Sequence, residues 1–421
     1  MTGNNAATPS LLRLAGFPYF LIAFIARLPF AMMVVGVLTL VVAARGSISL
    51  GGLTSAAVGL GTACFGPLLG AASDRFGQRV VLLVVATANG LLLAAFAWVS
   101  YSGLPDLALL ATAYLIGATA PQVAPLSRSR LVSLIRHRLA ADRHQRVLNS
   151  TMAYESAADE TVFIIGPFIV GLLASVIAPW APLVGAAIFT LVFVTAFALH
   201  PSGRATRPGS GRTDAVAPVR ELFRPALVVV VVGILGVGLF FGAMLTSLTS
   251  FMADRGAPEE AGLLYGVMGI GSAGFALGVA LFPERFTRAA RWLVFTTVIL
   301  IGALSLLFVH SVGGMMAALA VMGVGIGPTL VTQYSFAADR SPAGRSATVM
   351  TILGSAVIVG QSIGAAVTGE VAQRFGTEAA LLLPIIAAAI TLLAGLANAL
   401  IGRRLRATRE RDREREAPLS V

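Results

Sequence analysis

Charged residues are scarce in this sequence, and lysine is absent. Only 12% of the 421 residues are charged, while 57% are hydrophobic. A soluble domain carries about 25% charged residues, so the composition argues against a water-soluble enzyme. A disordered chain needs high charge and little apolar material, so disorder is disfavoured as well. The composition is that of an integral membrane protein.

Cysteine and histidine are also rare. Cys64 is the single cysteine, so neither an internal disulfide nor a cluster of thiolate metal ligands can form. The four histidines fall at expected loops or helix ends, and no two of them have metal-ligand spacing within a helix. The glycines of 323–327 follow no strand, and a phosphate-binding loop would need the missing lysine. We therefore expect no metal and no cofactor.

Twelve apolar segments are long enough to span a bilayer, which takes about 20 residues. They cover 17–44, 50–72, 80–101, 107–134, 149–177, 181–200, 225–252, 262–283, 292–310, 313–337, 347–370 and 379–401. The gap between the sixth and seventh segments is rich in Pro, Gly, Ser and Arg, as linkers are. The pattern predicts an all-α polytopic membrane protein whose twelve transmembrane helices form two pseudo-symmetric six-helix bundles. The expected order is a bundle over 1–200, a linker over 201–224, a bundle over 225–402 and a charged tail over 403–421.

The basic residues indicate an orientation. All 30 are arginines, and they lie in short gaps between the apolar segments. With the N-terminus inside, 26 of them fall in inside segments, and Arg45, Arg255 and Arg374 fall outside. Arginines accumulate on the cytoplasmic side of membrane proteins. We therefore expect cytoplasmic termini, a multi-pass chain in the cell's inner (plasma) membrane with an uncleaved first segment, and no nucleic-acid partner. The tail alternates in charge and should extend the last helix into water.

A polar segment between the second and third spans has a distinctive spacing. Residues 70–79 read GAASDRFGQR, and the defining positions are Gly70, Asp74, Arg75, Gly77 and Arg79. The segment resembles the signature of the major facilitator superfamily, where this loop holds the cytoplasmic side closed and releases it during transport. The twelve spans, the central linker and the inside termini extend the resemblance to nearly the whole chain, as in bacterial twelve-span members. A weaker copy, ALFPERFTRA, occupies 280–289.

The residue types suit such a loop. Gly70 allows another helix to approach closely, and Gly77 permits a tight turn. The two arginines can bind carboxylates or lipid phosphates at the inner face. The resemblance places Asp74 near the positive N-terminus of the eleventh span, where we expect Ser346 as the N-cap.

The fifth span carries a partial resemblance. Gly166, Pro167 and Gly171 resemble the Gly-Pro motif of efflux members of the superfamily, but Val170 replaces the first of its closing glycines. A proline bend with close packing is the alternative interpretation. Efflux members also often carry an arginine in the fourth span, where this chain has Ala113. The sequence therefore supports efflux only in part.

Ionisable residues inside spans are costly and mark functional sites. Six lie in the expected spans: Arg27, Arg128, Arg130, Glu155, Asp159 and Glu160. With a rise of about 1.5 Å per residue, Arg27 lies level with Asp159 and Glu160, and Glu155 lies level with the other two arginines. In one interpretation, three acids pair with three arginines in structural or gating contacts. In the other, Asp159 or Glu160 exchanges a proton as a cavity opens to each side.

Four neutral polar residues are candidates for lining that cavity: Gln122, Gln333, Tyr334 and Gln361. Hydrogen bonds between neighbouring helices are the alternative for each of them. We expect a monomer in the lipid bilayer that acts as a secondary transporter by alternating access. A proton gradient would drive efflux of a small, fairly apolar substrate, and proton-coupled uptake of a small organic solute is the alternative. A non-transporting sensor or an intramembrane enzyme is a remote alternative, because no catalytic constellation appears.

Overall fold

A computed structural model describes residues 11–206, 217–256, 261–283 and 285–416. Over these residues the chain is helical, and no strand occurs among them. Twelve helical segments are long and apolar enough to cross a membrane. The prediction of an all-α polytopic membrane protein with twelve transmembrane helices is therefore confirmed.

The first bundle contains the helices before residue 200. They are α1 (Leu11–Ala15), α2 (Phe17–Ile25), α3 (Leu28–Arg45), α4 (Ile48–Phe76), α5 (Gln78–Tyr101), α6 (Asp106–Ala118), α7 (Val123–Arg138), α8 (His144–Val176), α9 (Ala181–Phe189) and α10 (Thr195–Leu199). Three spans are interrupted, because α2 and α3 form the first, α6 and α7 the fourth, and a π-helical segment at Thr190–Val194 divides the sixth. Pro29 and Pro121 lie at the first two breaks, and each removes a backbone donor.

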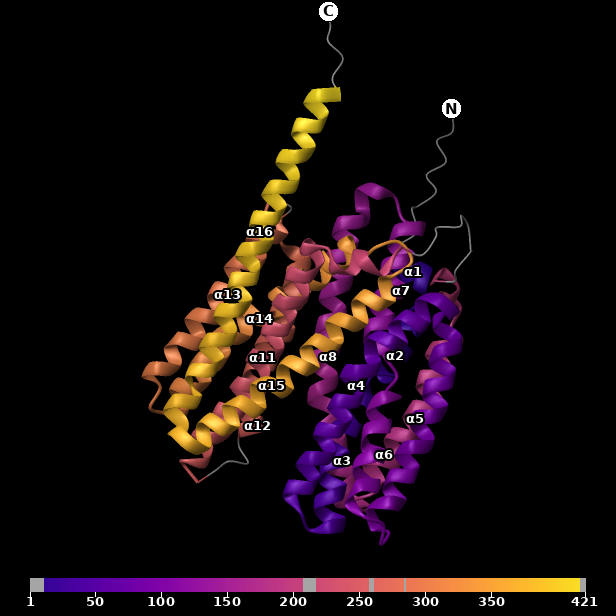
Figure 1. The fold of residues 1–421 in the computed structure, drawn as a ribbon, viewed down its shortest axis with the longest axis vertical. Helices are drawn as coiled ribbons and strands as arrows, with labels where there is room; N and C mark the ends of the chain where they lie inside the picture. The colour runs from indigo at the N-terminus through magenta and orange to yellow at the C-terminus, as the bar shows by residue number, and fades with distance from the viewer. Residues whose placement is uncertain (1–10, 207–216, 257–260, 284, 417–421) are drawn as a thin grey trace, which may run out of the picture.

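The second bundle contains the helices after residue 224. They are α11 (Pro225–Ala253), α12 (Ala261–Gly278), α13 (Arg288–Ser305), α14 (Val312–Arg340), α15 (Ser346–Ala380) and α16 (Leu382–Glu416). The described parts of the expected linker include two short 3₁₀ helices, η3 (Pro201–Thr206) and η4 (Val219–Phe223), and residues 207–216 lie outside the description. The helix α16 continues beyond the last span, as the yellow helix in Figure 1 shows.

The two bundles lie side by side, with the indigo-to-magenta helices next to the pink-to-yellow ones (Figure 1). Helices α4 and α7 of the first bundle contact α15, and α8 contacts α12 and α14. The helix α1 and the far end of α16 lie at the same end of the molecule, which we call the terminal face (Figure 1). These contacts define the surface on which the bundles meet.

Glycines bring α11 and α15 together within the second bundle. A Cβ atom at Gly242 would lie 2.0 Å from the carbonyl oxygen of Gln361, and one at Gly364 would lie 2.3 Å from that of Leu239. Such distances leave no room for a side chain, so the two backbones are in direct contact. Close backbone approach through small residues is how helices associate in membranes, where lipid removes the hydrophobic driving force.

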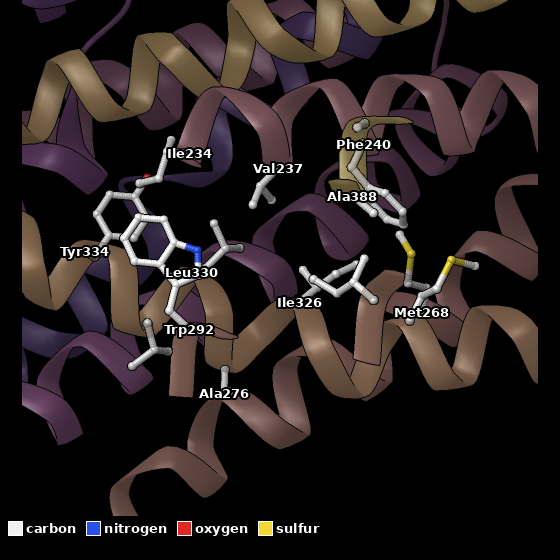
Figure 2. Close-up of a cluster of buried hydrophobic side chains, with 14 of the residues drawn as sticks. Ile234, Val237, Phe240, Met268, Ala276, Trp292, Ile326, Leu330, Tyr334 and Ala388 are labelled. Atoms are coloured by element: carbon white, nitrogen blue, oxygen red, sulfur yellow. The ribbon is translucent and has the colours of Figure 1, made fainter. Parts of the chain in front are cut away.

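The core of the second bundle surrounds Trp292. The indole Nε1 donates to the carbonyl oxygen of Thr391 at 3.2 Å. Figure 2 shows the indole beside Tyr334, Leu330 and Ile234. Tyr334 belongs to the same cluster of buried side chains, which also includes residues of α7 and α8 in the first bundle, so packing from both bundles holds its ring.

Candidate functional site

Four charged side chains form a cluster inside the first bundle, which we call the charge cluster: Arg27, Arg128, Glu155 and Asp159. Arg27 donates from Nη2 to Glu155, and its Nε lies 3.4 Å from Asp159 Oδ1. Arg128 Nη2 donates to Asp159 Oδ2 at 2.5 Å. Each arginine therefore has an acidic partner, and the net charge of the two arginines and two acids is zero.

The local structure explains how these groups meet. Arg27 lies at the break between α2 and α3, and Glu155 and Asp159 share one face of α8 by their spacing of four residues. Ser127, the neighbour of Arg128 on α7, donates to Glu155 Oε1 at 3.0 Å and shares a 2.8 Å hydrogen bond with the hydroxyl of Tyr19. Sequence reasoning missed Ser127 and Tyr19, although the polar run of residues 127–130 was a signal.

The members of the charge cluster differ in exposure. The Asp159 side chain is 24% exposed, whereas the side chains of Arg27, Arg128 and Glu155 are at most 3% exposed. Asp159 is therefore the accessible carboxylate of the cluster.

One contact joins the charge cluster to the second bundle. The guanidinium carbon of Arg128 lies 3.9 Å from the centroid of the Tyr334 ring on α14. Both residues are buried, so water does not screen this cation–π contact. Of the four predicted cavity residues, Tyr334 therefore lies next to the charge cluster, where the two bundles meet.

Arg130 has a different environment. Its Nε donates to Gln78 Oε1 at 3.2 Å, and its Nη1 donates to the carbonyl oxygen of Phe197 at 3.0 Å and to Ser202 Oγ at 3.2 Å. The described partners of Arg130 are neutral, so the pairing of this third arginine with an acid stays a prediction. Its contacts tie α7 to α5, α10 and η3. The side chain of Glu160 lies outside the described part of the structure.

The remaining cavity candidates do not gather around the charge cluster. Gln333 is buried within the second bundle, where its Nε2 would lie 2.9 Å from a Cβ atom at Gly233. Gln122 is the N-cap residue of α7, and its Nε2 donates to the carbonyl oxygen of Ala120 at 3.1 Å. Gln361 is exposed on α15. The sequence could not predict the direction in which these side chains point, because their spans are apolar on every side.

Asp74 lies at the terminal face and caps a helix of the other bundle. Its Oδ1 accepts from the backbone N–H of Ala347 at 3.1 Å, and its Oδ2 accepts from the N–H of Thr348 at 2.7 Å and from the Thr348 hydroxyl at 2.6 Å. These donors belong to the first turn of α15. The expectation that Ser346 is the N-cap is wrong, because Arg345 occupies that position without a side-chain cap and Asp74 satisfies the helix end instead.

The glycines of the same segment have clear structural reasons. A Cβ atom at Gly70 would lie 2.0 Å from Thr351 Oγ1, so α4 and α15 touch at this point. Gly77 has φ of 89° between α4 and α5, a conformation that other residues rarely adopt. Arg75 and Arg79 are both exposed beside this turn. We refer to Asp74, Gly70 and the first turn of α15 as the terminal clasp.

The other predicted segments lie apart from these sites. The helix α8 runs unbroken through Gly166, where a Cβ atom would lie 2.5 Å from Ala31 Cβ, and Gly171 has open space around it. The side chain of Pro167 lies outside the description, and so does Glu284 in the weaker copy of the signature. The close contact at Gly166 joins α8 to α3.

Two six-helix bundles, a balanced charge cluster inside one of them and a clasp between them define a polytopic helical membrane protein of the transporter class. The sequence pattern of the Major Facilitator Superfamily matches residues 19–357 and 288–421. The chain belongs to this superfamily, whose fold supports secondary transport. No curated relative matches the sequence.

Several solved structures share this fold at low identity. The human organic anion transporter MFSD10 (TETRAN) is 18% identical with a TM-score of 0.69, over 93% of this chain and 100% of that one. A bacterial homologue of the iron transporter ferroportin, in an outward-facing state, is 15% identical with a TM-score of 0.72, over 90% and 97%. The proton:xylose symporter XylE is 15% identical with a TM-score of 0.65, over 90% and 94%. These similarities establish the fold.

Substitutions in the charge cluster test whether its charges stabilise one another. We expect Arg27→Met to lower the free energy of unfolding by about 3–5 kcal/mol, because it leaves Glu155 buried without its partner. The neutral double variant Arg27→Met/Glu155→Gln should recover part of that loss. Thermal unfolding of the purified protein in detergent measures both, with Arg138→Met, at an exposed arginine, as the control. A double variant less stable than Arg27→Met would contradict mutual neutralisation.

Removing the charge of the terminal clasp should loosen the terminal face. Asp74→Asn deprives the α15 N-terminus of its anion, an effect of up to about 2 kcal/mol in partly buried positions. A thiol at Ser355→Cys, in a Cys64→Ser background, reports the opening, because Ser355 is buried against Gly66 of α4. We expect at least about fivefold faster maleimide labelling of this thiol. Asp106→Asn, which also removes an acid from the first turn of a helix, should leave the rate unchanged. Equal rates for both variants would refute the role of Asp74.

Proposed function

We propose that this protein is a proton-coupled efflux transporter that moves a small, fairly apolar compound out of the cell by alternating access. The observation that carries the proposal is the unequal exposure of the charge cluster, in which Asp159 is the accessible group. A partly uncovered carboxylate is the group of the cluster that we propose as the proton carrier. The remaining three charges stay buried and keep the site in place.

One proton on Asp159 changes the electrostatics of the whole cluster. With Asp159 charged, Arg27 and Arg128 balance Glu155 and Asp159. With Asp159 protonated, the cluster carries one net positive charge, and Arg128 loses its ion-pair partner. A buried ion without a partner is costly, so protonation changes the relative free energies of conformations that place Arg128 differently. Alternating access requires such a difference.

The proposed orientation and location of the chain rest on the distribution of its arginines. The segments at the terminal face are rich in arginine, so we assign this face to the cytoplasm and the chain to the plasma membrane, as a monomer. The terminal clasp would then close the cytoplasmic side in the described conformation, and the similarity to an outward-facing ferroportin homologue supports this assignment.

The apolar spans and the partial Gly-Pro motif of the fifth span favour efflux of an apolar compound. Ala113, where efflux members often have an arginine, leaves proton-coupled uptake as the alternative. XylE is a proton:xylose symporter, so the same fold also serves uptake in that protein. Transport assays therefore have to distinguish the two directions.

Inside-out membrane vesicles with an imposed pH gradient test proton-coupled efflux. We expect one class within a panel of lipophilic cations, neutral drugs, sugars and carboxylates to release protons, followed with a pH-sensitive dye. Asp159→Asn should abolish this response, because an amide cannot take up the proton, while Glu160→Gln tests the other candidate carboxylate. Asp106→Asn at equal expression is the control.

The possible outcomes separate the alternatives. A full response in Asp159→Asn would refute the role of this carboxylate in coupling. If no compound in the panel causes proton release, the next assay is counterflow in proteoliposomes. Counterflow of one compound would then favour uptake over efflux. Protein-dependent flux in either assay excludes a non-transporting sensor.

A further inference from the structure

The guanidinium of Arg128 is shared between the two bundles. On one side it bonds to the Asp159 carboxylate of α8, with Nη2 and Oδ2 2.5 Å apart. On the other side it lies 3.9 Å from the ring centroid of Tyr334 on α14. Arg128 and Tyr334 are both buried. A single cation therefore touches an acid of the first bundle and an aromatic ring of the second.

The effect of a proton on Asp159 depends on the charged and titratable side chains that interact with this carboxylate. Among the side chains that the structure describes, these are Arg27, next to α3, Arg128 on α7, Glu155 and Tyr154 on α8, and Tyr334 on α14. Arg27 is held by Glu155 in the same bundle. Arg128 has no second acid among its described ion pairs, so Asp159 and the Tyr334 ring are its two strong partners.

Two other polar contacts between the bundles lie elsewhere. Asp74 binds the first turn of α15, and Arg136 donates to the carbonyl oxygen of Ala338 near the end of α14. Both contacts lie near the chain connection at residues 341–345. Neither touches the charge cluster, so neither would sense a proton on Asp159 directly.

We infer that Tyr334 is a positioning residue that makes the contact between the bundles depend on the charge of Asp159, an inference that rests on the proposed function. A guanidinium neutralised by a carboxylate is drawn only weakly to the face of an aromatic ring. When Asp159 takes up a proton, Arg128 keeps its full charge, and the ring becomes its main partner. Protonation therefore strengthens the contact of α14 with Arg128 and changes the relative free energies of the conformations that keep or lose this contact. Deprotonation returns Arg128 to Asp159 and weakens that contact.

A spin-label pair on the full-length protein tests this inference without a known substrate. In a Cys64→Ser background, Gly103→Cys and His310→Cys place one exposed label on each bundle, in the connections that follow α5 and α13. The distance distribution gives the ratio of conformations from about pH 5 to about pH 8. We expect this ratio to change by at least about fivefold between these pH values in the parent protein.

Matched substitutions separate the ring from its hydroxyl. Tyr334→Phe keeps the aromatic face, so the pH dependence should persist. Tyr334→Leu and Tyr334→Met remove the face but keep an apolar side chain, so the pH dependence should disappear. A purely structural role would shift the ratio equally at every pH and leave the profile intact. If one of these two apolar variants does not fold, the other still provides the test.

The outcomes distinguish this inference from the proposed function. A full pH dependence in folded Tyr334→Leu or Tyr334→Met would overturn the inference about Tyr334. A full pH dependence in Asp159→Asn would show that another group takes up the proton, and the proposed function would fail at that residue. A parent protein whose ratio does not change with pH would overturn both. Loss of pH dependence in Asp159→Asn and in the apolar Tyr334 variants would support both.

Discussion

The mutual neutralisation of four charges, three of them buried, is the constraint on which the first bundle depends. An ion moved from water into the bundle loses several kcal/mol of solvation, and a partner at hydrogen-bond distance must offset that loss. The break between α2 and α3 places Arg27, and the helical spacing of four residues places Glu155 and Asp159 toward the two arginines. The same balance makes the cluster sensitive to a single proton, because one proton removes half of its negative charge.

The bundles meet through two kinds of contact with different physical characters. At the terminal clasp, a carboxylate satisfies the open N–H groups of a helix from the other bundle. Deeper in the molecule, a buried cation lies on the face of the Tyr334 ring. The Asp74 contact lies at the end of the molecule, whereas the Tyr334 contact involves Arg128 of the charge cluster. In the proposed function, transport requires the first contact to be released, and the second contact lets the cluster influence the second bundle.

The sequence predicted the number of spans because their length and hydropathy are properties of single segments. It also placed Arg27 level with Asp159, since the rise of a helix is constant. It did not predict the neutral partners of Arg130 or the place of Gln333 inside the second bundle. When a span is apolar on every side, the direction in which a given side chain points depends on packing with other helices. The cap supplied by Asp74 was expected near the eleventh span, but the N-cap residue there was not Ser346.

The central claim is that Asp159 is the carboxylate that gains and loses the proton. Infrared difference spectroscopy of the protein in lipid, recorded while the pH is lowered, detects the C=O stretch of a newly protonated carboxylic acid. We predict a band that appears in the parent protein and is missing in Asp159→Asn. A band of unchanged intensity in Asp159→Asn would contradict the claim and move the proton to another group.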